Sequence, residues 1–329
     1  MRIGAILPHM LVFGGVRRYI ELGNAFTLRG HSYTIFTPDG GPADWIDFTG
    51  NVKKLDTLTD VELDVAMCGS PELVEHLDRC TAAVKIFYLQ LEGIDREDQI
   101  IRSGRYQIMV NSSGLARRVR RRYSIDPLNG IGGNDPERFR PVDRSRDGGP
   151  FRILCYGRLS RPRKGTRFVI DAARWMHRRG FGIELHLFDT VPPGAPDPRI
   201  GFDPGIPYRF YLNLPQTQMA PMYGAADAFV SAEHRAGWSN TAAEAAACGL
   251  PLVCTKSGTE DFAVHGRSAL VIPLRLSLFI KRALVNLYRD RELAARLGPE
   301  ARKAILKFTW NKVCVRMEHM FQDLLKSRE

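Results

Sequence analysis

The hydrophobic pattern alternates between two kinds of segment along most of the chain. Short apolar runs rich in β-branched residues are followed by longer stretches in which apolar residues recur every three or four positions. This alternation is typical of a parallel β-sheet whose strands are joined by helices that cover both faces. In the first half it predicts strands at residues 3–7, 33–37, 63–67, 84–89 and 107–111 and helices at 16–29, 71–78 and 113–123.

The pattern breaks near residues 128–150, where glycine, proline and charged residues leave no room for a core element. A second alternation follows, and residues 312–325 predict a last helix. The pattern therefore predicts an α/β protein of two doubly wound Rossmann-like domains, residues 1–145 and 150–308, joined near residues 141–150. In the second domain we expect strands at 153–156, 183–187, 228–231, 252–255 and 270–272 and helices at 165–176, 240–248 and 276–289.

Composition supports two buried cores. The chain has 329 residues, of which 44% are hydrophobic, and domains usually hold roughly 100–200 residues. No apolar run approaches the roughly 20 residues that a membrane-spanning helix needs. The first residues are interpreted as a buried strand and not as a signal peptide, because Pro8 and His9 interrupt them and no small-residue cleavage site follows.

The formal net charge of +11 lies entirely in the second half. Residues 1–150 hold 20 basic and 20 acidic residues, whereas residues 151–329 hold 27 and 16. Residues 101–122 nevertheless carry seven arginines and no acid. No nucleic-acid-binding motif accompanies them, so we expect no nucleic-acid partner. The run is interpreted either as a solvated helix face or as a peripheral contact with anionic lipid head groups.

The six cysteines form no CxxC pair and lie in or beside apolar segments. This usage is typical of reduced thiols in a cytoplasmic enzyme, and it predicts no zinc or other metal site. The residues are Cys68, Cys80, Cys155, Cys248, Cys254 and Cys314.

Candidate chemistry is expected where strands end, because doubly wound sheets bind ligands outside the carboxyl ends of their strands. Gly14 and Gly15 follow the first strand and fit either a tight turn or the close approach of a phosphate or sugar. Arg158 and Lys164 follow the first strand of the second domain. Lys164 lies just before a helix N-terminus, so both cations could converge on a diphosphate.

A third stretch runs from Glu233 to Pro251. Ser239 or Asn240 can cap a helix whose first amides could hold phosphate oxygens. Glu244 interrupts a small, apolar face of that helix, and a buried carboxylate needs hydrogen-bond donors. Two adjacent sugar hydroxyls could supply them, as could an arginine.

Five segments together resemble the retaining glycosyltransferases of family 4, which have the two-domain GT-B fold. They are GGVRRY after the first strand, GNDPERFRP at 133–141, GRLSRPRKG at 157–165, residues 238–251 and KFTW at 307–310. The resemblance covers nearly the whole chain. It implies that the helix at about residues 310–329 packs back on the N-terminal, acceptor-side domain, and that the C-terminal domain binds a nucleotide-sugar.

The resemblance also implies residue roles. Arg158 and Lys164 match the pair that grips the donor diphosphate, and Glu244 matches the acid that binds the ribose of the nucleotide. The donor and acceptor loop near the reaction centre is matched by Gly14, Gly15 and Arg17, and the loop that meets the phosphates by Ser239, Asn240 and Thr241. A nucleotide-diphosphate sugar is the co-substrate, with no cofactor and no metal required.

Three departures from the family pattern concern the sugar side. Ala236 stands where the family has the first acid of its E-x7-E motif, and Glu233 lies three residues upstream. Gln90 and Glu92 replace the usual histidine after the strand at 84–89, and residues 188–194 replace a glycine-rich turn. The catalytic candidates are therefore Gly15, Glu233, Gln90 and Glu92.

The expected activity is retaining transfer of a sugar from a nucleotide-diphosphate sugar to a hydroxyl acceptor, which could be a saccharide, a lipid-linked molecule or a small molecule. The alternative is a catalytically impaired homologue that binds the nucleotide-sugar and acts as a binding or partner subunit. The expected location is cytoplasmic, with peripheral contact at the inner face of the membrane as one interpretation of the arginine run.

Overall fold

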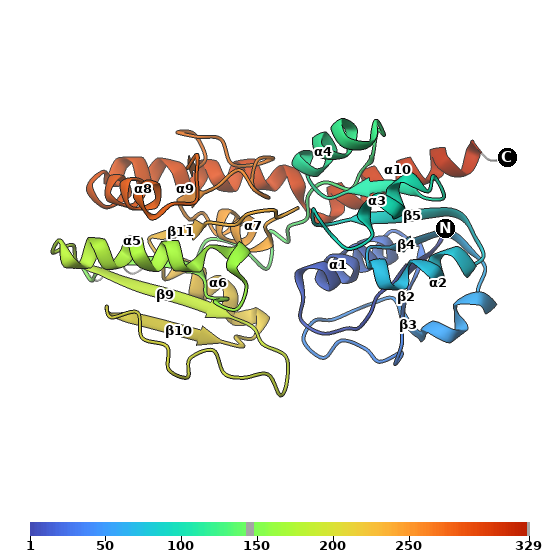
Figure 1. Cartoon of the computed structure of the whole chain (residues 1–329), viewed down its shortest axis with the longest axis horizontal. Helices are drawn as coiled ribbons and strands as arrows, with labels where there is room; N and C mark the ends of the chain where they lie inside the picture. The colour runs from blue at the N-terminus through green and yellow to red at the C-terminus, as the bar shows by residue number, and fades with distance from the viewer. Residues whose placement is uncertain (143–147, 328–329) are drawn as a thin grey trace. The chain divides into compact units, whose positions relative to one another are not determined.

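The computed structural model describes residues 1–142 and 148–327 (Figure 1). The chain divides into two compact units: unit 1 is Met1–Gly133 with Trp310–Glu329, and unit 2 is Asn134–Thr309. Each unit contains one parallel sheet with helices on both faces. The α/β prediction with two Rossmann-like domains is therefore confirmed.

The sheet of unit 1 has seven parallel strands in the order β3-β2-β1-β4-β5-β6-β7. The five predicted strands are all present, within two residues at each end. The short strands β3 and β7 at the two edges were not predicted, because one is mostly polar and the other has two residues. The strands are β1 Arg2–Ile6, β2 Ser32–Thr37, β3 Asn51–Lys54, β4 Leu63–Cys68, β5 Ala82–Leu89, β6 Gln107–Val110 and β7 Leu128–Asn129.

Helices cover both faces of this sheet. One face packs against α1 (Gly14–Leu28) and α10 (Trp310–Lys326), whose Trp310, Val313 and Met317 share a buried cluster with strand residues such as Ile3. The other face packs against α2, α3 and α4. Their bounds are Val74–Arg79, Glu97–Arg102 and Ser113–Tyr123. Residues from the end of the chain thus complete the core of unit 1.

The sheet of unit 2 has six parallel strands in the order β10-β9-β8-β11-β12-β13. All five predicted strands are present, and β10 was not predicted. The strands are β8 Phe151–Tyr156, β9 Ile183–Asp189, β10 Tyr208–Leu212, β11 Ala228–Ser231, β12 Leu252–Cys254 and β13 Leu270–Val271.

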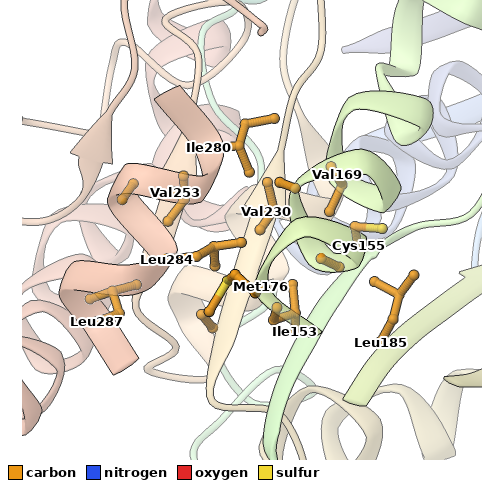
Figure 2. Close-up of a cluster of buried hydrophobic side chains, with 14 of the residues drawn as sticks. Ile153, Cys155, Val169, Met176, Leu185, Val230, Val253, Ile280, Leu284 and Leu287 are labelled. Atoms are coloured by element: carbon orange, nitrogen blue, oxygen red, sulfur yellow. The ribbon is translucent and has the colours of Figure 1, made fainter. Parts of the chain in front are cut away.

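Two helices, α5 (Thr166–Arg178) and α8 (Ser277–Arg289), cover one face of the second sheet. Figure 2 shows Val169 and Met176 of α5 and Leu284 of α8 turned toward the strands. The remaining helices of unit 2 are α6 Gln216–Gly224, α7 Asn240–Ala247 and α9 Arg291–Ile305. Among the described residues, no helix is both long enough and apolar enough to cross a membrane.

Unit 2 begins at Asn134, earlier than the join expected at residues 141–150. Residues 143–147 of that expected join lie outside the described residues. Phe139 explains the difference. Its buried ring packs edge-on against Tyr223, with ring centroids 6.1 Å apart, and its carbonyl accepts a hydrogen bond from Arg302 at 3.2 Å. Residues 134–142 therefore belong to unit 2.

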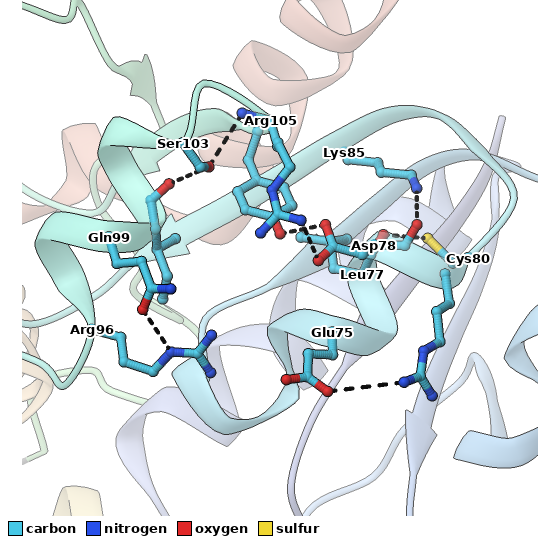
Figure 3. Close-up of polar contacts among 12 residues, drawn as sticks. Glu75, Leu77, Asp78, Cys80, Lys85, Arg96, Gln99, Ser103 and Arg105 are labelled. Carbon is cyan, nitrogen blue, oxygen red and sulfur yellow. Dashed lines mark hydrogen bonds and ion pairs between the residues drawn. The ribbon is translucent and has the colours of Figure 1, made fainter.

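Basic side chains of residues 101–122 pair with acids of unit 1. Arg105 donates to Asp78 at 2.9 Å (Figure 3). On α4, Arg118 pairs with Glu97, Arg120 with Asp126 at 2.6 Å and Arg122 with Asp98 at 2.8 Å. These pairs support the interpretation of the arginine run as a solvated, locally neutralised helix face.

Candidate functional site

The strand order of each sheet places a ligand site at the carboxyl ends of its strands, where the sequence also predicts one. In both units the chain reverses direction across the sheet beside its first strand, between β1 and β4 and between β8 and β11. Ligands of doubly wound sheets bind in the crevice outside such a switch point. Gly14 follows β1, Arg158 follows β8, and Glu233 follows β11, so predicted residues flank both switch points.

In unit 2, Lys164, Glu233 and Ser239 form a connected polar group. Lys164 Nζ donates to Glu233 Oε2 at 2.7 Å, and Ser239 Oγ donates to Glu233 Oε1 at 3.0 Å. The side chain of Glu233 is 8% exposed and that of Lys164 is 22% exposed. One carboxylate thus holds the predicted diphosphate-binding lysine and a residue of the predicted phosphate loop.

Gly165 explains how Lys164 comes so close to the end of β11. Its φ of +72° lies in the left-handed region, and a Cβ there would collide with the carbonyl oxygen of Ala232. Thr166 Oγ1 donates to the carbonyl of Tyr156 at 2.9 Å and ties the start of α5 to β8. The glycine lets the turn at Pro162–Lys164 approach the strand end directly.

Arg158 is held by the end of the neighbouring strand β9. Its Nε donates to Asp189 Oδ1 at 3.0 Å, and its Nη2 donates to the carbonyl oxygen of Thr190. The ring of Tyr156 lies under both cations, with its centroid 5.4 Å from the Arg158 guanidinium and 5.2 Å from Lys164 Nζ. Burial and the Asp189 carboxylate raise the pKa of Tyr156, so its phenol stays protonated.

A small cavity lies between these residues. Lys164, Glu233 and Thr241 contribute its polar wall. Two further atoms are notable: the hydroxyls of Ser231 and Thr241, which both line the cavity, are buried and have no hydrogen-bond partner among the described residues. Buried hydroxyls without partners are rare in folded proteins. This end of the sheet therefore keeps hydrogen-bonding capacity for a polar ligand.

The expectation that a side chain caps α7 is wrong for Ser239. Ser239 occupies the N-cap position of the helix, but its side chain makes no capping hydrogen bond and turns to Glu233 instead. The first amides of a helix have no partner within the helix. Asn240 and Thr241 begin the helix at half-buried positions, where their amides suit an anion.

Glu244 is buried one turn into α7 and is held by a residue that the sequence did not indicate. Tyr223 Oη donates to Glu244 Oε2 at 2.8 Å, and Tyr223 itself is fully buried. The carboxylate thus has a phenolic donor from α6. Its proposed contact with a ribose remains a prediction.

In unit 1 the structure brings Gly15 and Gln90 together. A Cβ on Gly15 would lie 3.0 Å from Gln90 Oε1, so the glycine leaves space for this amide. Glu92 instead lies 3.7 Å from Arg118 Nε. Arg17 Nε lies 3.4 Å from Glu21 Oε1 on the same helix. Gly15 and Gln90 therefore form a pair, whereas Glu92 belongs to an ion-pair network.

Asp189 and Tyr223 are site residues that sequence reasoning missed. Asp189 was noted only as part of a replaced turn, although adjacent parallel strands place it beside Arg158. Tyr223 had no signal in the sequence, because its contact with Glu244 joins two helices across 21 residues. Within residues 1–142 and 148–327, no group of three His, Cys, Asp or Glu side chains could hold a metal ion.

Comparison with known sequences finds one family model and several related enzymes that are similar to parts of the chain. Residues 150–290 match the family model of glycosyl transferases group 1. D-inositol 3-phosphate glycosyltransferase from Arthrobacter sp. is 27% identical over 186 residues, 53% of this chain and 44% of its own length. The same enzyme from Rhodococcus erythropolis is 26% identical over 279 residues, 77% of this chain and 61% of its own. The chain spans about half the length of the curated relatives it matches.

Solved structures share the fold over almost the whole chain. Sucrose-phosphate synthase from Thermosynechococcus elongatus has a TM-score of 0.78 at 16% identity and covers 99% of both chains. Anabaena HepE in complex with UDP-glucose has a TM-score of 0.77 at 15% identity, covering 98% of this chain and all of its own. The chain has the GT-B fold, and its residues 150–290 are similar to the group 1 glycosyltransferases.

Proposed function

We propose that this protein transfers a sugar from a nucleotide-diphosphate sugar to an acceptor hydroxyl. The observation that carries the proposal is the meeting of Lys164 and Glu233 at one cavity beside the β8/β11 switch point, with Ser239 hydrogen-bonded to Glu233 and Arg158 following β8. Structural neighbours that bind UDP and UDP-glucose support a donor of this class.

The charges suit a diphosphate leaving group. Breaking the bond between the sugar and the diphosphate leaves negative charge on the phosphate, which fixed cations stabilise more strongly as it grows. Lys164 and Arg158 are cations already positioned by Glu233 and Asp189, so little reorganisation is needed. The amides at the start of α7 add the positive end of a helix dipole.

We further propose retention of configuration by front-face displacement. In this step the acceptor oxygen forms a bond to the anomeric carbon on the face that the diphosphate leaves, and the departing phosphate oxygen takes the acceptor proton. Glu233 would bind hydroxyls of the donor sugar in place of the acid missing at Ala236. Gln90, which lies beside Gly15 in unit 1, would contact the acceptor.

No cofactor or metal enters this proposal, since the two cations and the helix amides provide the charge stabilisation. The acceptor is proposed to be a saccharide, a lipid-linked molecule or a small alcohol. A cytoplasmic location is supported by the six cysteines, which are all free and buried.

The test starts with a thermal-shift panel of UDP, GDP, ADP and dTDP on the full chain. A ligand at 100 times its dissociation constant should stabilise the protein by about 2.7 kcal/mol. Donor sugars of the best nucleotide are then assayed for transfer and hydrolysis, with and without EDTA, and NMR assigns the anomeric configuration of the product. Inversion of configuration would contradict the retaining mechanism, and loss of activity in EDTA would contradict metal independence. Absence of any activity would contradict sugar transfer itself. Nucleotide binding without turnover on every donor would indicate the binding homologue instead.

A further inference from the structure

Two segments of unit 2 contain no acidic residue. Residues 148–170 hold six lysines or arginines and residues 262–289 hold five, without one Asp or Glu in either segment. The first segment includes β8 and the turn before α5, and the second includes β13 and all of α8. Part of the charge surplus of the second half is thus concentrated in two pieces of chain.

These segments meet at the carboxyl edge of the sheet. Arg275 Nη1, in the loop between β13 and α8, donates to the carbonyl oxygen of Pro162 at 3.1 Å. Arg275 also lies over the ring of Phe168, 5.6 Å from its centroid, and Arg167 lies over the same ring at 4.6 Å. The turn before α5 and the loop before α8 therefore form one continuous surface.

Three leucines project from this surface into solvent. Leu274, Leu276 and Leu278 occupy alternate positions and are 57%, 45% and 39% exposed. Leu276 is also the N-cap residue of α8, a position where a polar side chain is usual, and it makes no capping hydrogen bond. We call this surface the leucine–arginine patch, made of Leu274, Leu276, Leu278, Arg163, Arg167 and Arg275.

The cations of the patch differ from those of α4. Within the described part of the chain, no carboxylate pairs with Arg163 or Arg167, both of which are exposed. On α4, by contrast, Arg118 and Arg122 pair with acids. The first turn of α8 contains no acid, so its helix dipole adds to the positive potential of the patch.

Exposed leucines surrounded by unpaired arginines match one kind of partner. An anionic bilayer offers phosphates to the guanidinium groups and an apolar boundary layer to the leucines. A nucleic acid would satisfy the arginines but leave the leucines in water. We propose that the leucine–arginine patch docks on an anionic phospholipid membrane, with the leucines entering the boundary between head groups and acyl chains.

This inference does not rest on the proposed transferase activity, because it uses neither Lys164 nor Glu233. It does have a consequence for the candidate site. The patch lies at the carboxyl edge of the second sheet, where Arg158 and Lys164 also lie. Docking would therefore hold the candidate site of unit 2 beside the membrane surface.

Flotation of the full chain with lipid vesicles tests the inference. We expect binding to vesicles of phosphatidylcholine mixed with phosphatidylglycerol and none to phosphatidylcholine alone. Leu274→Ser with Leu276→Ser should weaken partitioning about tenfold, through the loss of apolar area. Arg163→Gln with Arg167→Gln should weaken it about fivefold per charge.

Two control variants make the result specific. Ile200→Ser removes a side chain that is 82% exposed outside the patch, and Arg121→Gln removes an exposed charge on α4. Neither should change binding, and the melting temperature and nucleotide thermal shift of all variants should match those of the wild type. The inference is overturned if the wild type ignores anionic vesicles, if the leucine variant binds as the wild type does, or if Arg121→Gln abolishes binding. Binding of the wild type to an oligonucleotide at low salt, without binding to anionic vesicles, would overturn the inference and assign the patch to nucleic acid.

Discussion

Lys164 Nζ lies 2.7 Å from Glu233 Oε2, and this ion pair sets the charge of the candidate donor site. Glu233 follows β11 and Lys164 precedes α5, so the pair links the two strands at the switch point. The carboxylate positions the lysine and at the same time offsets its charge. A diphosphate that binds Lys164 must compete with this carboxylate or share the lysine with it.

Glu233→Gln separates these two effects. Because the amide keeps the shape but loses the negative charge, nucleoside-diphosphate affinity should stay the same or rise. Turnover should fall about 100-fold if Glu233 contacts the donor sugar. Calorimetry and steady-state kinetics measure the two quantities separately. Turnover within twofold of the wild type would remove Glu233 from the catalytic candidates.

Arg158→Ala should weaken nucleoside-diphosphate binding about 10- to 100-fold, because a hydrogen bond to a charged group is lost. Asp189→Asn should weaken it less, since the amide oxygen can still accept from Arg158 Nε. Arg199→Ala is the matched control, since Arg199 is an exposed arginine that pairs locally with Asp197 at 2.6 Å. Equal affinities for Arg158→Ala and Arg199→Ala would show that the diphosphate binds elsewhere.

Tyr223→Phe removes a donor from the buried Glu244 carboxylate. The free energy of unfolding should fall by about 1–3 kcal/mol, and the melting temperature by several degrees. Tyr208→Phe is the control, because its hydroxyl donates at 3.1 Å to the Phe202 carbonyl at an exposed site. If both variants have the same melting temperature, the Tyr223–Glu244 contact contributes little to stability.

Gly165→Ala and Gly180→Ala form a second matched pair. Both glycines have positive φ, +72° and +79°, but only the Cβ at 165 would collide with another residue. Gly180→Ala should cost about 1 kcal/mol of stability from backbone strain alone. Gly165→Ala should cost more and should also weaken nucleotide binding, since Lys164 would be displaced. Chemical denaturation and calorimetry of both variants check the difference.

The buried cysteines predict a distinct alkaline behaviour. Burial raises the pKa of Cys68, Cys155, Cys254 and Cys314 to about 12. The native thiols should therefore resist a disulfide reagent at pH 8, and all six should react in denaturant. In the unfolded chain these thiols ionise near pH 9. Their contribution to the free energy of unfolding is therefore constant below pH 9 and is lost progressively as the pH rises toward 12. Rapid native labelling would contradict this burial.

Sequence patterns predicted most of the fold because buried parallel strands form continuous apolar runs. The pattern failed where that rule does not apply. The edge strand Asn51–Lys54 is exposed along most of its length, and β10 is half-exposed. Helix α9 follows α8 without a loop and contains Pro299, which obscures its boundary. These elements are defined by their neighbours more than by their own residues.

The candidate site was predictable only in part for a similar reason. Arg158, Lys164 and Glu233 follow strands, so the strand pattern placed them at one edge of one sheet. Their pairing partners depend on side-chain directions that no local pattern encodes. Ser239 shows this limit. Its position suits a helix cap, but its hydroxyl donates a hydrogen bond to the carboxylate of Glu233 instead.

Helix α10 has a consequence for the order in which the protein can fold during synthesis. Unit 2 is complete in the chain at Thr309, whereas unit 1 still lacks Trp310, Val313 and Met317 of its core at that point. The ribosome must therefore finish unit 2 before it supplies the last part of unit 1. Gly133, whose φ is +130°, leaves room for the incoming Trp310 ring. One face of the unit 1 sheet thus stays incompletely covered during synthesis until α10 has left the ribosome.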